Sequence, residues 1–224
     1  MAQSRPFDLE NETAARLVAA AEELFAQRGQ ENVSLRDLTN RAGVNVAAVN
    51  YHFGSKEALA EALHEKLAQR ISEQRRKALM DLSKVQLNRR NRRAHLEALL
   101  RSFIDPYLGE GNENQGRLLA RLFLHHRLNP TEGSLRITKV YLDPIAAEYI
   151  RALIATCPHV PPHEFYWRYV YMVNMLIAVS ADVTSVERIA VLSGGEIKDS
   201  TTRSTRYETV LRFLIGAFWG ADER

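Results

Sequence analysis

The sequence predicts an all-α protein, with three short helices at the front of the chain and a larger helical bundle behind them. Apolar residues recur at spacings of three and four along the 224 residues, and no stretch keeps the alternation of a strand. Glycines and prolines end the apolar segments at intervals typical of helix lengths. We therefore expect two units, residues 1–55 and residues 56–224.

The front unit is predicted to hold three helices in close succession. The first covers about 12–27, and the second opens behind the N-cap Ser34 and ends at Gly43. The third runs over about 46–53 behind the cap Asn45. A helix, a short glycine turn and a second short helix form the outline of a helix-turn-helix motif.

The back unit begins with a long fourth helix. Ser55 caps this helix, which reaches at least Lys77, and the region 83–93 weakens the apolar pattern like a joint. The loop 193–205 is expected to be the least structured internal stretch. Further helices are predicted near 94–108, 115–128, 133–157, 162–182 and 205–219.

The composition is that of a globular chain in a reducing compartment. Hydrophobic residues make up 46% of the sequence, and Cys157 is the single cysteine, so no intramolecular disulfide can form. The start of the chain is polar and lacks the apolar core of a secretion signal. The longest apolar run, 169–181, is interrupted by Asn174 and is shorter than the roughly 20 residues of a membrane span. We expect a cytoplasmic protein that makes no membrane contact.

The net charge of +3 is unevenly distributed along the chain. Residues 1–65 hold six Lys and Arg against ten Asp and Glu, whereas residues 66–101 hold eleven against three. A solvated helix face or linker explains such a basic block, and electrostatic attraction of nucleic acid is the alternative.

The third helix has two contrasting faces when its residues are placed at 100° per position. Val49 and Phe53 point inward, whereas the outer face carries small and polar side chains and no carboxylate. The outer residues are Ala47, Ala48, Asn50 and Tyr51. Alanines let a helix enter the major groove deeply, and Asn can pair with an adenine edge. The sequence therefore predicts a DNA-reading helix.

Phosphate contacts are predicted around this helix, where they would set its register on the duplex. The candidate donors are Ser34, Asn45, Tyr51 and Lys56. His52 is included in the predicted interface, although packing beside Phe53 explains it as well, and Ser34 can act as an N-cap alone. Arg5, in the polar start of the chain, can reach a minor groove.

The segment "SLRDLTNRAGVNVAAVNYHFGSKEAL" resembles the signature of TetR-family transcriptional regulators, and the resemblance covers residues 12–65. It implies that the outer residues of the third helix enter the groove and that Lys56 binds phosphate. Asn50 stands where many family members carry an aromatic residue. The resemblance also implies a C-terminal helical domain that binds a small effector and forms a two-fold dimer, with repression relieved by the ligand.

Two C-terminal segments support a homodimer that reads a palindromic DNA operator. The segment 158–182 is apolar nearly all round, and 207–220 adds a second apolar face with the small pair Gly216 and Ala217. Paired in two copies, these helices would form a four-helix bundle. The alternative is that both face the core of their own chain.

The middle of the back unit is loosely similar to the fatty-acid-sensing branch of the family, which implies a fatty acid or acyl thioester as effector. An apolar cavity is predicted to be lined by Phe103, Tyr107, Phe123, Trp167, Tyr171 and Met175. Arg121, on an otherwise apolar helix, is the candidate partner of an anionic head group. Ordinary core packing and an unrelated drug-like or aromatic effector are the alternatives.

Other classes of protein find less support. The chain has no Gly-rich phosphate loop, zinc-ligand spacing or nucleophile elbow, so no enzyme activity, cofactor or metal is expected. The adjacent His125 and His126 face different ways and make a poor metal pair. A helical interaction protein that does not bind DNA is the remaining alternative, but it leaves the acid-free face of the third helix unexplained.

Overall fold

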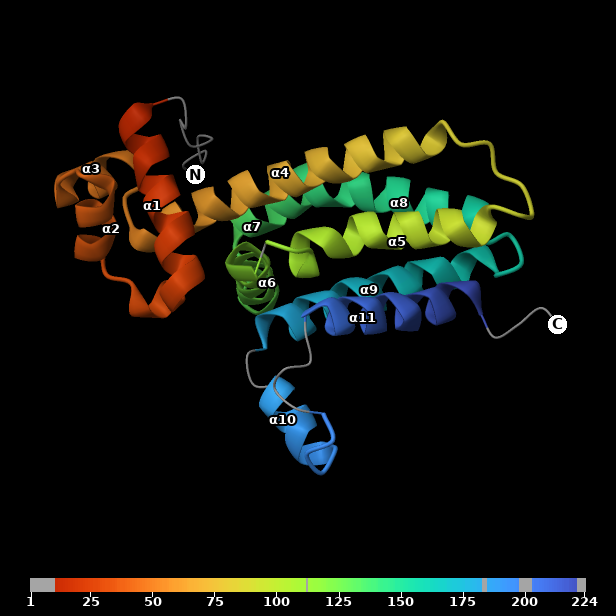
Figure 1. Cartoon of the computed structure of the whole chain (residues 1–224). Helices are drawn as coiled ribbons and strands as arrows, with labels where there is room; N and C mark the ends of the chain where they lie inside the picture. Colours follow the sequence, from red (N-terminus) through yellow and green to blue (C-terminus); the bar gives the residue numbers. More distant parts are fainter. Residues whose placement is uncertain (1–10, 112, 183–184, 198–202, 221–224) are drawn as a thin grey trace.

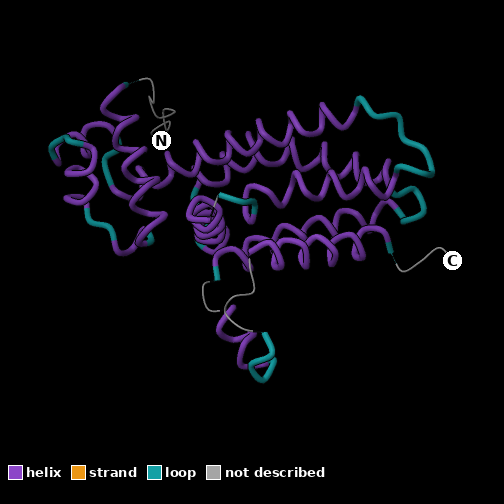
Figure 2. Tube along the Cα trace, in the orientation of Figure 1, coloured by secondary structure: helices purple, strands orange, loops and turns teal. Residues whose placement is uncertain are grey.

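The computed structural model describes residues 11–111, 113–182, 185–197 and 203–220. Within these ranges every regular element is helical, which confirms the all-α prediction (Figures 1 and 2). Arg5 lies outside the described residues.

The front helices begin and end at the residues that their capping chemistry predicts. They are α1 (Glu12–Arg28), the short 3₁₀ turn η1 (Gln30–Asn32), α2 (Leu35–Ala42) and α3 (Val46–His52). Ser34 forms a capping box with Asp37, and the Asn45 side chain accepts a hydrogen bond from the N–H of Ala48 at 3.0 Å. Gly43 ends α2 with φ +66°, a left-handed conformation that glycine adopts readily.

One long helix carries the chain from the front helices into the bundle. This helix, α4 (Lys56–Ser83), has 28 residues and is therefore about 42 Å long. A non-helical stretch over 84–91 follows, at the predicted joint, and leads to α5 (Arg92–Leu108) and α6 (Glu113–Leu128).

The single helix expected over 133–157 is three elements in the structure. They are α7 (Glu132–Ile137), a π-helical turn η2 (Thr138–Leu142) and α8 (Asp143–Thr156). Pro144 has no N–H and cannot follow an α-helical turn without a clash. The chain widens before it, so that the N–H of Asp143 bonds to the carbonyl of Thr138, five residues back.

The last helices are α9 (Pro162–Ala181), α10 (Ser185–Leu192) and α11 (Arg203–Trp219). The sequence predicted α9 and α11 but no helix at α10, which extends away from the body of the protein (Figure 1). Long helices α4, α5, α8, α9 and α11 run side by side to form the bundle (Figures 1 and 2).

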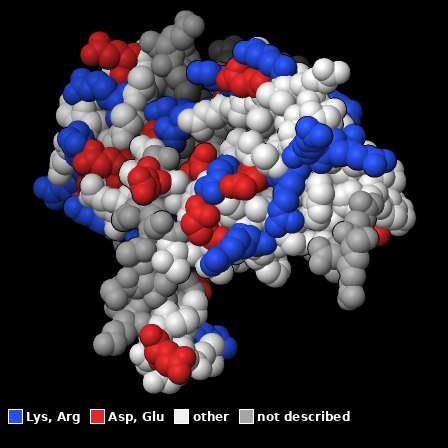
Figure 3. Space-filling view, turned by 45° about the vertical axis from the view of Figure 1, so that its right-hand side comes forward, with Lys and Arg blue, Asp and Glu red and all other residues white. Residues whose placement is uncertain are grey.

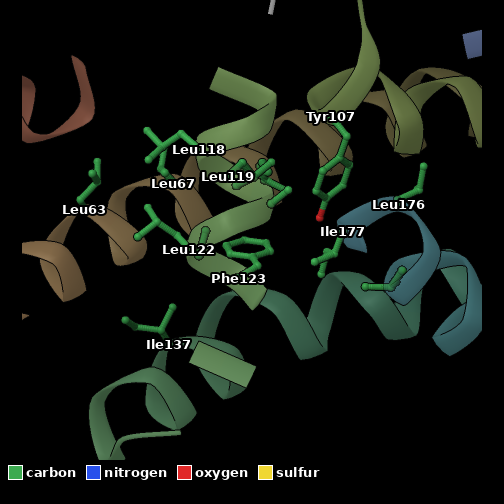
Figure 4. Packing of buried hydrophobic residues seen from close by; sticks show 14 of the residues in the cluster. Leu63, Leu67, Tyr107, Leu118, Leu119, Leu122, Phe123, Ile137, Leu176 and Ile177 are labelled. Carbon is green, nitrogen blue, oxygen red and sulfur yellow. The ribbon is translucent and has the colours of Figure 1, made fainter. Parts of the chain in front are cut away.

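The helix α6 crosses this bundle and joins it to the front helices. Its buried residues Leu119, Leu122 and Phe123 lie among side chains of α4, α5, α7 and α9, such as Leu67 and Ile177 (Figure 4). On its other side α6 packs against α1, which also packs against α4. The front helices and the bundle therefore share one continuous core.

An ion triad fixes α1 to α4 within this contact. The carboxylate of Glu22 accepts hydrogen bonds at 2.9 Å from both Lys66 and Arg70. Burial raises the pKa of Glu22, but the two cations outweigh this effect and the pKa lies below its ordinary value. Charge pairs as well as apolar packing therefore hold α1 against α4.

Part of the basic block of the sequence lies at the end of α4 opposite α3. Lys84, Arg89, Arg90 and Arg93 are exposed there, and Figure 3 shows Lys and Arg gathered on that part of the bundle. The length of α4 places this end about 40 Å from α3. Among the described residues, no helix is long and apolar enough to cross a membrane.

Candidate functional sites

The structure gives α3 the two faces that its sequence predicts. Val49 is fully buried and Phe53 is 8% exposed, and both pack into the front core. On the outer side Ala47 and Asn50 are exposed, and Tyr51 is 85% exposed. A ring this exposed contributes little to the hydrophobic core. Together with the neighbouring amide and methyl groups, it can contact a nucleic acid.

The residues on either side of this exposed face form contacts within the chain. Ala48 and His52 are half-buried, and the ring of His52 lies edge-on to that of Tyr51 with centroids 5.0 Å apart. The hydroxyl of Ser34 accepts the N–H of Asp37 at 3.1 Å in the capping box. Asn45 likewise uses its side-chain oxygen as a cap, and its amide N–H groups have no acceptor among the residues that the structure describes.

Lys56 has a structural role that its sequence context does not reveal. Its ammonium donates hydrogen bonds of 2.8 Å to the backbone carbonyls of Gln30 and Val33. These bonds tie the start of α4 to the turn after α1. An ammonium has three N–H groups, so one is left for a phosphate.

Arg36 is a basic residue of the helix-turn-helix that the sequence analysis did not single out. It is exposed on α2, and no ion pair or hydrogen bond of its side chain is found within the described part of the chain. Arg41 on the same helix differs, because it pairs with Glu23 of α1. An unpaired Arg two residues after the cap Ser34 is a further candidate for phosphate contact.

A cavity of about 390 Å³ lies in the bundle between α4, α5, α6, α7, η2, α8 and α9. Its apolar wall is formed by Tyr107, Phe123, Pro130, Leu135, Leu142, Ala146, Tyr169 and Val173. Its polar wall is formed by His64, Arg75, His126, Arg127, Ser134, Thr138 and Asp143. The size of the cavity, and a lining that combines an apolar wall with a polar one, suit a small molecule that has both apolar and polar parts.

Arg75 is the unusual member of this wall. The side chain belongs to α4 and is only 4% exposed, yet its Nε and Nη2 atoms have no hydrogen-bond partner among the described residues. Its guanidinium lies over the ring of Phe103, with 3.6 Å between Cζ and the ring centroid. A buried cation without an anion is costly, so this residue marks the cavity as a polar binding site.

Two histidines stack at the same cavity. The rings of His64 on α4 and His126 on α6 are nearly parallel, with centroids 4.2 Å apart. Burial lowers the pKa of His64 to about 3 and that of His126 to about 4, and in each case a neighbouring histidine adds to the effect. Both imidazoles are therefore neutral near pH 7 and present uncharged nitrogen atoms.

Only some of the residues that the sequence predicted for the cavity line it in the structure. Tyr107 and Phe123 line the cavity, and Phe103 lies behind Arg75. Met175 is half-buried and packs against the core without lining the cavity. Sequence periodicity identified Tyr107 and Phe123 of the lining but missed Tyr169 and Arg75, because only tertiary packing turns one face of α9 inward and buries one arginine of a basic helix.

Three of the predicted cavity residues lie elsewhere. Trp167 and Tyr171 are 63% and 65% exposed on the outer face of α9, where their rings stack on each other. Arg121 lies in a groove between α6 and the front helices, which Lys56 and Glu57 also line. Their helices turn these side chains away from the cavity, so Arg121 is corrected from a head-group partner to a residue of the interdomain groove.

The exposed face of α9 continues onto α11. On α9 it consists of Tyr166, Trp167, Val170 and Tyr171, and on α11 of Phe213 with Gly216 and Ala217 beside it. A Cβ added at Gly216 would meet no atom within 4 Å, so another backbone can approach there closely. The residues Leu211, Leu214 and Phe218 instead face the core of their own chain.

Two family models match the chain. The model described as "Bacterial regulatory proteins, tetR family" matches residues 17–63, and "Tetracyclin repressor-like, C-terminal domain" matches residues 101–217. The first match contains α2 and α3, and the second contains most of the bundle.

Curated relatives resemble parts of the chain. The HTH-type transcriptional repressor Rv3405c of Mycobacterium tuberculosis is 34% identical over 97 residues, which are 43% of this chain and 49% of the relative. The dual regulator CecR of Shigella flexneri is 27% identical over 143 residues, or 62% of each chain. The chain thus spans about half the length of the mycobacterial relative.

Solved structures share the fold over nearly the whole chain. A transcriptional regulator from Rhodococcus sp. RHA1 superimposes with a TM-score of 0.60 at 19% identity, covering 92% of this chain and 95% of the other. The fatty acid degradation regulator FadR from Bacillus halodurans gives 0.57 at 13% identity, covering 91% and 95%. At these identities the similarity establishes the fold.

Proposed function

Because this chain belongs to the TetR family of transcriptional regulators, whose members are not enzymes, we propose that it is a repressor that leaves a palindromic DNA operator when a small apolar effector binds. The observation that carries this proposal is the outer face of α3. It exposes Ala47, Asn50 and Tyr51 and holds no carboxylate that would repel a phosphate backbone.

The exposed faces of α9 and α11 support a homodimer. Four large apolar side chains of α9 and Phe213 of α11 would be left in water by a monomer. Two copies related by a two-fold axis would bury them in a four-helix bundle and place two α3 helices for two half-sites.

The effector response is attributed to a shift between two conformers. The cavity is lined by His64 and Arg75 of α4, the helix that begins at Lys56 next to the helix-turn-helix. A ligand that binds one orientation of α4 better than another would change the spacing of the two α3 helices. A coupling of about 3 kcal/mol would weaken DNA binding roughly a hundredfold.

The cavity wall is coupled directly to α4. Arg136 of α7 donates hydrogen bonds of 3.0 and 2.9 Å to Glu65, and the hydroxyl of Thr131 donates one of 2.9 Å to Glu61. Displacement of α7 by a ligand would therefore pull on the first three turns of α4. The triad at Glu22 would pass the movement to α1.

An elongated apolar effector, such as a fatty acid or acyl thioester, fits the lining best. Aromatic and aliphatic side chains form a continuous part of the lining, and the cavity extends over several helices. The FadR structure supports this class only by its fold, since its identity to this chain is 13%.

Selection of bound sequences from random duplex DNA tests the regulator proposal. We expect a two-fold symmetric site, bound with an affinity that falls steeply with salt, and a mass of two chains per site by native mass spectrometry. Selection of no sequence, or of an asymmetric site bound by a monomer, would refute the proposal. Release of the selected duplex by fatty acids would then test the effector class.

A further inference from the structure

We propose that Arg75 is the anchor of a carboxylate, so that the cavity takes the free acid of a single aliphatic chain in preference to its neutral ester or alcohol. This inference rests on the proposed function, because it names the head group and the recognition residue of the effector in that same cavity.

Arg75 carries a buried charge that has no anionic partner among the described residues. Arg75 is 4% exposed, and no carboxylate of the described residues forms an ion pair with it. Isolated buried charges destabilise a fold strongly unless an anion and hydrogen bonds compensate them. Since the protein offers no such anion at this place, a ligand that brings its own carboxylate would complete the site.

The guanidinium of Arg75 presents one edge in a fixed orientation. The two unpartnered atoms are Nε and Nη2, which form one edge of the guanidinium plane. Stacking on Phe103, with Tyr107 at 6.0 Å from Cζ, fixes the orientation of that plane. A fixed edge with two free N–H groups matches the two oxygens of a carboxylate, whereas a neutral ester or alcohol supplies no anion for it.

Among the described residues that line the cavity, no other buried charge would compete with Arg75 for an anion. The other ions that line it are Arg127 and Asp143, both exposed, and Arg127 already donates to the side chain of Asn174. The groups that the structure shows close to Arg75 are the aromatic rings of Phe103 and Tyr107. One anion and one apolar chain satisfy both parts of this lining.

The geometry also explains how such a ligand would act on α4. Arg75 lies 11 residues after His64, just over three helical turns, so both face the cavity from the same side of α4. A chain held at Arg75 would therefore contact α4 over about 16 Å of its length.

The test uses purified full-length protein and pairs of probes with equal chain length. Straight-chain acids from hexanoate to hexadecanoate are compared with the corresponding primary alcohols by thermal shift and titration calorimetry. We expect at least one acid to raise the melting temperature by several degrees and to bind at least about tenfold more tightly than its alcohol.

Three variants identify the anchor. Arg75→Met should abolish the difference between acid and alcohol, and Arg75→Lys should keep part of it because the charge remains. Arg76→Met removes the same charge from the next residue of α4, which is exposed, and should behave like wild type. Ligand-free Arg75→Met should melt no lower than wild type, because an uncompensated buried charge has been removed.

Equal binding of acid and alcohol, absence of binding by every acid, or unchanged acid binding by Arg75→Met would overturn the inference. If Arg75→Met fails to fold, the wild-type comparison of acid with alcohol and the Arg75→Lys variant decide the matter. The regulator proposal is tested separately by DNA selection. Acids that bind through Arg75 but do not release the selected duplex would sustain the carboxylate site and refute the proposed effector response.

Discussion

Asn50 and Tyr51 are neighbours on the exposed face of α3 and are expected to contribute differently to DNA binding. Asn50→Ala should remove a base-edge contact, weakening binding to the preferred site by about 1–3 kcal/mol and relaxing the preference at that base pair. Tyr51→Ala should weaken binding to all sequences alike. Repeating the selection from random duplexes with each variant measures this, and an unchanged site for Asn50→Ala would contradict the base-reading role.

Lys56 combines a structural role with its predicted phosphate contact. Its hydrogen bonds to Gln30 and Val33 mean that Lys56→Ala disturbs the turn before α2 as well as any phosphate contact. A loss of DNA affinity in that variant therefore measures both effects together.

His64 should make the ligand-free protein sensitive to acid. Its pKa is about 3 in the folded state and about 6.5 when unfolded, so the unfolded chain takes up the proton first as the pH falls. Stability is unaffected above pH 7 and is lost progressively between pH 6.5 and 3. From pH 7.5 to 5.5 the contribution of this residue is a loss of about 1 kcal/mol.

Denaturant unfolding of His64→Leu at the two pH values checks this expectation. The variant should lose less stability than wild type on acidification, by about that amount. His163→Leu, at an exposed position of α9, serves as the control. An equal acid loss in His64→Leu and wild type would show that the buried imidazole is not responsible.

At the scale of elements, the packing of α6 on α5 depends on Gly116. A Cβ at this position would lie 2.1 Å from the backbone oxygen of Tyr107, a residue that lines the cavity. Gly116→Ala should therefore displace α6 and destabilise the fold by about 1–3 kcal/mol, despite the better helix propensity of alanine. Chemical denaturation measures the loss.

Gly133→Ala is the matched control for this prediction. The atoms nearest to its added Cβ belong to the carboxylate of Glu61, which ends a flexible side chain and can move aside. A loss for Gly133→Ala as large as that for Gly116→Ala would show that backbone contact between α5 and α6 is not the cause.

At the scale of the whole molecule, the dimer should depend on the apolar face of α9 and α11. Phe213→Glu places a charge at the centre of that face and should yield a folded monomer with little affinity for a two-fold site. Met80→Glu, at an exposed position near the far end of α4, should remain dimeric. Sedimentation with and without the selected duplex tests both, and a dimeric Phe213→Glu would assign the interface elsewhere.

The residues that cap and orient the front helices could be predicted from sequence because their interactions are with residues close by in the chain. Ser34, Gly43 and Asn45 act within one helical turn, and the inward turn of Val49 follows from helix periodicity alone. The same local patterns predicted α9 and α11 and the aromatic positions Tyr107 and Phe123.

Tertiary structure alone decided which charged residue faces the cavity. Arg75 stands in a basic stretch of α4 and Arg121 on a largely apolar helix, but the packing of α5 over α4 buries Arg75, whereas Arg121 faces the front helices. The exposure of Trp167 and the Lys56 bonds to the turn after α1 were decided in the same way. Helix periodicity determines which residues share a face, and the neighbouring helices determine what that face meets.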